Sequence, residues 1–534
     1  MIQYDMHIEA LKIEELNPEV VHYIKTLETD KLRLTELEKH YNNLQFEYTT
    51  LKEQYDLLIY QKFCRSAEKL RADDMQPSLF AEELEQPIRP EAETEEQEIQ
   101  SYTRKKPGRK PIDANIPRVE EIIDIPEEEK ICACGAQMTK IGEETSEKLE
   151  IIPQSLFVRK TIRPKYVCRC CEGTEDEDTP AVRIAPVPPA IIPRSIASAS
   201  LLSYIMIQKY QDHLPFFRQE TLFQRFGIAI SRQDMSNWQQ QVFEKLIPLF
   251  NVLKDTVKSG PVLRMDETTV QVMGEEDRKD TQKSYMWLAR GGPPDKTVVY
   301  YEYHPTRSAY HARDFLEGYK GFLQTDGYEG YNAAVRELPE VIHVGCFAHA
   351  RRKFFEAAKA AKKPRSAEEG IKYIRKLYEI ESSLRDGMKN KSTNEDAFLD
   401  ERKKQAEPVL HEFHQWLNKR ANEVLPSALL GKAVAYTLKE WHKLVRYLES
   451  PYLTPDNNAS ENAIRPFVLG RKNWLFNKSP DGAKSSCGMY SLIETAKQNG
   501  VEPLQYLRVL FEKAPHAASA EDWDKLLPWN IFNS

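Results

Sequence analysis

The sequence lacks any apolar run of about twenty residues, the length that a helix needs to cross the hydrocarbon core of a membrane. We therefore expect no membrane-spanning segment in this chain of 534 residues. The first fifteen residues are acidic and contain no hydrophobic signal-peptide segment. We accordingly expect a protein that stays in the compartment where it is made.

Cysteine is scarce, and the few cysteines are clustered. The chain has eight, of which five fall between residues 132 and 171. This distribution favours a reduced compartment and a metal site over a disulfide framework. We therefore expect a cytoplasmic protein.

An excess of positive charge is also missing, because the net charge is −7. Whole-chain charge does not argue against nucleic-acid binding, since local basic patches survive such averaging. With 41% apolar and 29% charged residues, the composition is that of globular domains joined by polar linkers. The length predicts three or four domains.

Residues 31–60 have a heptad pattern, and we expect residues 1–75 to form a coiled-coil oligomerisation region. An amphipathic helix packed on its own domain is the alternative. The two apolar heptad positions hold Leu37, Leu44, Leu51 and Leu58, and, three residues before each, Leu34, Tyr41, Tyr48 and Tyr55.

Residues 76–118 are expected to be a linker that is first acidic, over residues 82–100, and then basic. A short basic segment around P-G-R-K-P suits a narrow A·T-rich minor groove, and a solvated basic linker is the alternative. The basic residues are Arg104, Lys105, Lys106, Arg109 and Lys110.

Residues 119–180 are expected to form a zinc-ribbon domain, in which two close cysteine pairs flank a strand-rich interval at residues 151–162. Four thiolates around one tetrahedral ion satisfy zinc. Cys170 would be spare, and unrelated buried thiols are the alternative. The expected ligands are Cys132, Cys134, Cys168 and Cys171.

Residues 195–250 read as a helical region. We expect a helix that ends at Gly227, then a short turn, and then a second helix capped by Ser231. The lengths of these elements and their start and stop signals are those of a helix-turn-helix. Such helix pairs also occur in plain bundles, so both interpretations stay open.

From residue 258 the pattern changes to strands. Segments 262–272, 284–290 and 297–303 are rich in β-branched and aromatic residues, and a helix at 309–319 and a strand at 321–331 follow. This order predicts the first part of a ribonuclease-H-like α/β core at residues 258–364. Asp266 on the first strand and Asp326 at the end of the fourth would project to one edge.

A basic helix follows at residues 343–358, with cations suited to a DNA backbone. A solvated basic face is the alternative. Its candidate DNA-binding residues are His349, Arg351, Arg352 and Lys353. Residues 365–450 are charged and periodic, and are expected to be a helical insertion without chemistry of their own.

The core resumes at residues 451–500, where Glu461 lies in a short polar helix. Asp456 or Asn457 is expected to cap this helix, and Pro466 is expected to end it. An exposed ion pair between Glu461 and Arg465 is the alternative. Residues 501–534 are expected to be a helical tail. Further DNA-binding candidates are Arg465, Arg471, Lys472 and Trp474.

Several of these motifs together resemble the transposases of the insertion sequence 66 family. The resemblance spans nearly the whole chain, with a short C-A-C-G at the first cysteine pair and Ser460 as departures. It rests mainly on M-D-E-T at 265–268, T-D-G-Y-E-G-Y at 325–331, C-F-A-H-A-R-R-K-F at 346–354 and D-N-N-A-S-E-N-A-I-R-P-F-V-L-G-R-K-N-W at 456–474.

The resemblance implies a DDE transposase, with Asp266, Asp326 and Glu461 as the acidic triad that holds Mg²⁺ or Mn²⁺. It also implies zinc at the cysteines, DNA ends and target DNA as partners, and accessory proteins of the same element. We expect Glu267 to point to the opposite sheet face. A catalytically inactive DNA-binding or regulatory derivative and a structure-selective nuclease are the alternatives. The expected architecture is a multidomain α+β protein.

Overall fold

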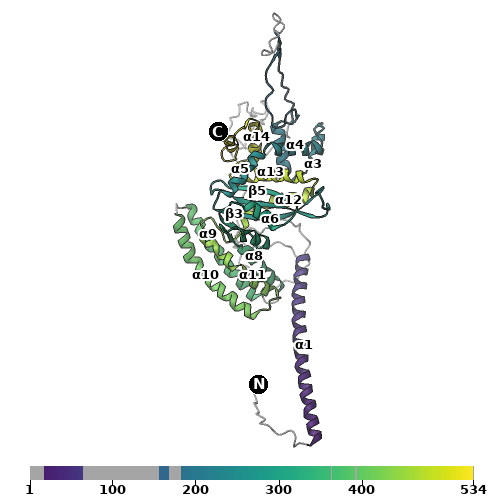
Figure 1. Ribbon diagram of the computed structural model, residues 1–534, viewed down its shortest axis with the longest axis vertical. Helices are drawn as coiled ribbons and strands as arrows, with labels where there is room; N and C mark the ends of the chain where they lie inside the picture. Colours follow the sequence, from purple (N-terminus) through teal and green to yellow (C-terminus); the bar gives the residue numbers. More distant parts are fainter. Residues whose placement is uncertain (1–16, 64–155, 168–181, 362–363, 391–393, 533–534) are drawn as a thin grey trace, which may run out of the picture. The chain divides into compact units, whose positions relative to one another are not determined.

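The computed structural model describes residues 17–63, 156–167, 182–361, 364–390 and 394–532 (Figure 1). The chain divides into two compact units, residues 85–185 and the remainder. Within the smaller unit, strands β1 (Lys165–Val167) and β2 (Val182–Ile184) pair antiparallel. The described part of the interval expected to be strand-rich, residues 156–162, holds no strand. All four expected zinc ligands and the basic segment at 104–110 lie outside the described residues.

The predicted N-terminal helix is present as α1 (Pro18–Phe63). Its heptad side chains are exposed; Leu44 and Tyr48, for example, keep 66% and 64% of their surface in solvent. The side chain of Leu58 lies outside the described residues. The coiled-coil pairing itself stays a prediction.

Two helices joined by a turn lie where the sequence pattern predicted them, and the choice between a helix-turn-helix and a plain bundle stays a prediction. Helices α2 (Ala199–Tyr210), α3 (Phe216–Arg225), α4 (Arg232–Lys245) and α5 (Ile247–Lys258) occupy this region. Gly227 takes a positive φ of 75°, which glycine adopts without strain, and so ends α3. Ser231 and Asp234 form a reciprocal capping box that starts α4.

A mixed sheet forms the centre of the larger unit. Its strands are β3 (Val262–Val272), β4 (Lys283–Gly291), β5 (Val298–His304), β6 (Gly321–Gln324) and β7 (Val341–Val344), in the order β5-β4-β3-β6-β7. The first three are antiparallel, whereas β6 and β7 run parallel to β3. Strand β6 is shorter than predicted, and β7 was not predicted.

Helices cover this sheet (Figure 1). Helices α5 and α13 (Pro480–Gln498) pack against β5, and α12 (Asn458–Trp474) packs against β3 and β4. Further helices of the larger unit are α6 (Ala309–Leu316), α7 (Glu329–Arg336), α14 (Pro503–Lys513), η4 (Ala514–His516) and α15 (Ala520–Lys525), and the short strand β8 (Phe476–Asn477) joins the sheet by pairing with β3.

Residues 365–450, which were expected to be a helical insertion, contain α9 (Arg365–Asn390), α10 (Glu395–Glu423), α11 (Leu429–Leu444) and η3 (Val445–Glu449). Helix α8 (Phe347–Ala360), from the segment assigned to the core, packs with them around a shared hydrophobic cluster. Arg402 is fully buried, where it pairs with Glu381 at 2.8 Å and donates to the carbonyl of Leu453 at 3.1 Å. The insertion is thereby fastened to the segment that leads into α12.

Pro466 does not end the helix that carries Glu461, so that prediction was wrong. Helix α12 continues through Pro466 to Trp474. An internal proline costs about 3 kcal/mol because a hydrogen bond is lost and the ring crowds the preceding turn. Burial of Ile464 and Phe467, on either side of Pro466, offsets this cost.

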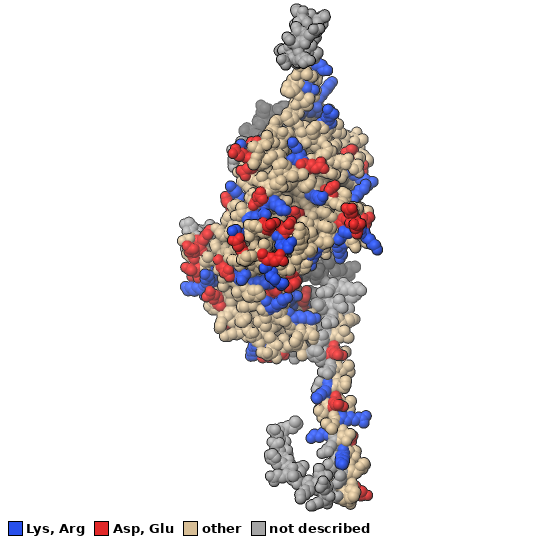
Figure 2. All heavy atoms as spheres, viewed as in Figure 1, with Lys and Arg blue, Asp and Glu red and all other residues tan. Residues whose placement is uncertain are grey.

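The surface around the sheet carries charges of both signs, interspersed on the face that Figure 2 shows. None of the helices in the described ranges combines the length and the apolar character required to cross a membrane.

Candidate active site

Asp266 and Asp326 lie at corresponding positions of two parallel strands. In the ladder between β3 and β6, Arg264 is opposite Gln324. Asp266 follows Arg264 by two residues and lies within β3, and Asp326 follows Gln324 by two residues and lies just after β6. Parallel strands carry such positions to the same edge of a sheet, and both predicted acids are therefore brought together there.

The same two strands hold the segment that precedes the third acid. The Arg264 guanidinium donates to Gln324 Oε1 at 3.1 Å and to the carbonyl of Tyr452 at 2.9 Å. The Gln324 amide in turn donates to the carbonyl of Thr454 at 2.7 Å. Because these groups are buried, each lost bond would leave an unsatisfied polar atom, which fixes the path of the chain.

The start of α12 is fixed to β3 and α8. Asn457 donates its side-chain amide to the carbonyl of Met265 at 3.1 Å, and its backbone N–H to Cys346 Sγ at 3.2 Å. Asp456 Oδ1 accepts the N–H of Asn458 at 3.0 Å, so Asp456 caps the helix as predicted. Glu461 follows one turn into α12 and is buried, with 6% of its side chain exposed.

Burial and charged neighbours raise the pKa of two of the three acids, Asp266 and Glu461. Burial raises the pKa of Asp266 well above its usual range, and the nearby carboxylates Glu267, Asp326 and Glu461 raise it further. Burial also raises the pKa of Glu461; the Arg352 guanidinium opposes this rise, and Asp326 adds to it. Partly buried carboxylates that repel one another at one sheet edge need a cation to be ionised together.

Helix α8 brings two further groups to Glu461. His349 Nδ1 lies 3.8 Å from Glu461 Oε1, and Arg352 Nη2 lies 3.6 Å from Glu461 Oε2. Burial, and then the charge of Arg352, lower the pKa of His349 to about 4. His349 is therefore neutral near pH 7, where its ring can donate or accept a hydrogen bond.

Glu267, the acid next to Asp266, is held in a separate contact that sequence reasoning missed. Arg307 donates to its Oε1, with Nε at 2.7 Å, and Tyr331 of α7 donates to its Oε2. Arg307 also lies 3.8 Å from the ring centroid of Tyr328. The Tyr328 N–H donates to Asp326 Oδ1 at 2.9 Å. The contacts of Arg307 with Glu267 and Tyr328, which we call the Arg307 clamp, therefore also help to orient Asp326.

The other predicted DNA-binding residues occupy α8 and α12. Arg351, Arg352 and Lys353 lie on α8, and Lys353 Nζ is 4.7 Å from the ring centroid of Tyr436. On α12, Lys472 is exposed, whereas Arg465 is half-buried. Arg471 donates to Thr268 Oγ1 at 3.2 Å. Trp474 packs edge-on against Phe467, with ring centroids 5.5 Å apart, so its ring is engaged within the protein.

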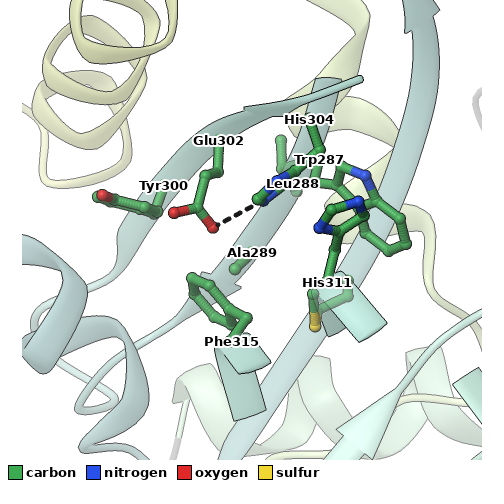
Figure 3. Close-up of a pocket in the computed structure, with 9 residues that line it drawn as sticks. Trp287, Leu288, Ala289, Tyr300, Glu302, His304, His311 and Phe315 are labelled. Atoms are coloured by element: carbon green, nitrogen blue, oxygen red, sulfur yellow. Dashed lines mark ion pairs between the residues drawn. The ribbon is translucent and has the colours of Figure 1, made fainter. Parts of the chain in front are cut away.

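A small cavity lies elsewhere on the sheet, lined by residues that include Trp287, Glu302, His304 and His311 (Figure 3). The imidazoles of His304 and His311 stack with their centroids 4.0 Å apart, and His304 pairs with Glu302 at 3.3 Å. The cavity measures about 10 Å³. It has room for about one water molecule, and it is therefore no substrate site.

The carboxylate cluster has the chemistry of a hard-cation site. Its donor atoms are carboxylate oxygens, which Mg²⁺ and Mn²⁺ prefer. Glu461 Oε1 is buried and has no hydrogen-bond partner among the described residues. A buried carboxylate oxygen of this kind fits a cation ligand, and the residues present thus fit a divalent ion.

Comparison with known proteins identifies the family of the chain. A model described as "Transposase IS66 family" matches residues 194–485, which includes all three acids. The chain belongs to the IS66 transposase family. An IS66 C-terminal element matches residues 491–529.

The N-terminal matches cover regions that are largely undescribed. A "zinc-finger binding domain of transposase IS66" matches residues 129–172, which contain all four expected zinc ligands. A model described as "Transposase C of IS166 homeodomain" matches residues 50–120, from the second half of the heptad segment through the basic segment.

Two relatives match this chain over most of their length. The uncharacterized protein y4hP of Sinorhizobium fredii (strain NBRC 101917 / NGR234) is 30% identical over 453 residues, which cover 81% of this chain and 78% of that protein. The uncharacterized protein y4qI of the same strain is 31% identical over 483 residues, which cover 87% of this chain and 85% of that protein.

Proposed function

We propose that this IS66-family chain cleaves the ends of its mobile element and joins them to target DNA, with Asp266, Asp326 and Glu461 as the catalytic carboxylates. The observation that carries the proposal is the convergence of these acids from three separate segments, where, in addition to burial, Asp326 and Glu461 raise the pKa of Asp266 and Asp326 raises that of Glu461. The strand order, three antiparallel strands followed by two parallel ones, supports a ribonuclease-H-like core.

The residues of this site have different proposed roles. Asp266 and Asp326 supply oxygens from the sheet, and Glu461 supplies one from α12. Bound Mg²⁺ or Mn²⁺ would provide the charge that activates an attacking hydroxyl and stabilises a leaving oxygen in phosphoryl transfer. Arg352, with 47% of its side chain exposed and 3.6 Å from Glu461, is proposed to contact a DNA phosphate.

The remaining modules would hold DNA and pair protomers. Two element ends must be brought together before joining, and the exposed heptad stripe of α1 is suited to pairing two chains. The cysteine cluster with its zinc, the basic segment and the pair α3–α4 are proposed to contact DNA. Lys472 is proposed to contribute a backbone contact.

The test is cleavage and strand transfer on a supercoiled plasmid that carries the element's ends, with Mg²⁺ present or omitted. Omission is preferable to a strong chelator, which would also strip zinc from the cysteines. Glu461→Gln is the variant, because glutamine keeps the size of glutamate but removes its charge. Glu302→Gln, in a partly buried acid of β5 that pairs with Lys254, is the control.

Wild type and Glu302→Gln should cut and join DNA only with Mg²⁺, and Glu461→Gln should bind DNA without cutting it. Activity in Glu461→Gln would remove Glu461 from the catalytic set. Cleavage without joining by the wild type would favour a structure-selective nuclease. DNA binding without any cleavage by the wild type would favour a non-catalytic derivative.

A further inference from the structure

A second set of metal-ligating groups lies beside the carboxylate cluster. One ligand atom from each of Cys346, His349 and Glu461 lies within 4.8 Å of the other two. Cys346 immediately precedes α8, His349 lies in its first turn, and Glu461 comes from α12. The set combines a thiol, an imidazole and a carboxylate.

Two of these atoms lack the partners that buried polar atoms normally have. Among the described residues, neither His349 Nδ1 nor Glu461 Oε1 has a hydrogen-bond partner, although both atoms are shielded from solvent. Their separation of 3.8 Å is too long for a hydrogen bond. Buried polar groups almost always have a hydrogen-bond partner or another ligand. Two neighbouring ligand atoms without such a partner therefore indicate a bound group between them, such as a metal ion.

We propose that Cys346, His349 and Glu461 bind a borderline or soft divalent cation such as Zn²⁺ or Co²⁺, at a site that shares Glu461 with the catalytic carboxylates. The donor set decides the class of ion. Zinc accepts thiolate, imidazole and carboxylate ligands together, whereas Mg²⁺ takes oxygen ligands and has little affinity for sulfur or nitrogen. This site goes beyond the proposed function and does not depend on it.

The geometry requires only small adjustments. Zinc–ligand bonds are about 2.0–2.3 Å long, so two ligands on one ion lie at most about 4.6 Å apart. Rotation of the three side chains closes the remaining gap. Arg352, whose Nη1 lies 3.5 Å from His349 Nε2 and whose Nη2 lies 3.6 Å from Glu461 Oε2, is half-exposed and would turn toward solvent as Nε2 takes the imidazole proton.

Protons balance in a simple way. Burial raises the pKa of the Cys346 thiol, so the thiol keeps its proton until an ion arrives. Coordination releases that proton to solvent and leaves a thiolate on the ion. His349 is neutral beforehand and loses no net proton; its proton resides on Nε2 while Nδ1 binds the ion.

Occupation of this site would withdraw Glu461 from the catalytic set. Traces of a thiophilic ion would then inhibit the enzyme even with Mg²⁺ in excess, because sulfur and nitrogen ligands select that ion. Inhibition would be relieved when the ion is removed.

The test is a Co²⁺ titration of the full chain with zinc retained at its cysteine cluster. The thiolate-to-cobalt charge-transfer absorption is recorded, together with the cobalt and zinc content per chain. The wild type should bind one additional cobalt per chain with a thiolate band and no loss of zinc. Cys346→Ser should lose the band, and His349→Gln should weaken cobalt binding by at least about tenfold.

Cys487→Ser is the matched control, because Cys487 is also buried and outside any disulfide, but lies on α13, where the described His, Cys, Asp and Glu side chains form no group of three ligand atoms with it. It should keep both the band and the affinity. A band that is absent from the wild type, or that persists in Cys346→Ser, would overturn the proposal. Thermal melting verifies that each variant is folded, and if Cys346→Ser does not fold, unchanged cobalt affinity in His349→Gln overturns the proposal by itself.

Discussion

The side chain of Asn457 donates to the carbonyl of Met265 at 3.1 Å, across 192 residues of sequence. Met265 immediately precedes Asp266, and Asn457 lies four residues before Glu461. This one contact therefore fixes the start of α12 against the strand that carries the first acid. It makes Asn457 a positioning residue for the carboxylate cluster.

Asn457→Ala should lower the free energy of unfolding by about 1–3 kcal/mol, because the buried carbonyl of Met265 loses its partner. Denaturant unfolding of the full chain measures this. Asn473→Ala is the control, since Asn473 is exposed on the same helix and makes only a 3.5 Å contact. It should change stability by less than about 0.5 kcal/mol. Equal effects of the two substitutions would contradict the positioning role.

The metal-free protein should become less stable as pH rises from the acid range toward neutrality. The folded state raises the pKa of Asp266 above its unfolded value, so the folded state keeps this proton to higher pH. Stability is then full below the unfolded pKa and is lost as pH rises through the folded pKa.

Asp266→Asn removes that penalty and should stabilise the protein at neutral pH in Mg²⁺-free buffer, on the order of 1 kcal/mol for each pKa unit. Added Mg²⁺ should stabilise the wild type more than the variant. Unfolding curves at several pH values check both statements. Asp314→Asn, at an exposed site on α6, should have no comparable effect. A destabilised Asp266→Asn variant would argue against the crowded carboxylate cluster.

Much of the site was predictable because its acids sit in motifs with local signals. Asp266 lies in a β-branched strand, and Asp456 precedes a helix that it caps. The contacts that bring the acids together were not predictable. Asn457 and Met265 are joined only through the packing of a helical insertion, and no local pattern encodes such a contact.

The errors have physical reasons too. Proline normally ends a helix, and this local rule led to the wrong prediction at Pro466. The burial of Phe467 in the folded protein outweighs the cost of keeping Pro466 inside α12. Strand β7 (Val341–Val344) is only four residues long, which is too short for an alternating pattern of apolar and polar residues to be recognised. Arg307, which holds Glu267, lies in a loop whose sequence carries no signal of the partner.

Arg307→Ala should destabilise the protein by about 1–3 kcal/mol, since the carboxylate of Glu267, 2% exposed, would lose a charged donor. Chemical denaturation is the measurement, and a double-mutant cycle with Glu267→Gln isolates the pair. The exposed pair Arg313–Glu337 provides the comparison, because Arg313→Ala should cost less than about 1 kcal/mol. A zero coupling energy for Arg307 and Glu267 would refute the clamp.

Leu44→Glu combined with Leu51→Glu should abolish self-association of the full chain. Both side chains lie on the exposed heptad stripe of α1. When two chains pair through this stripe, the introduced carboxylates would be buried in the coiled-coil seam, which is energetically costly. Analytical ultracentrifugation measures the oligomeric state. Lys39→Glu, exposed on the same helix but off the stripe, should leave it unchanged. A monomeric wild type would remove the proposed role of α1.

The most direct measurement of the central claim is the metal dependence of an Asp326→Cys variant in the plasmid cleavage and joining assay. A thiolate binds Mg²⁺ poorly but accepts the softer Mn²⁺. If Asp326 is a ligand of the catalytic ions, the variant should be inactive with Mg²⁺ and regain cleavage with Mn²⁺, whereas the wild type should be active with both. Full activity of the variant with Mg²⁺, or the same loss with both ions, would contradict the assignment of Asp326 and with it the three-carboxylate site.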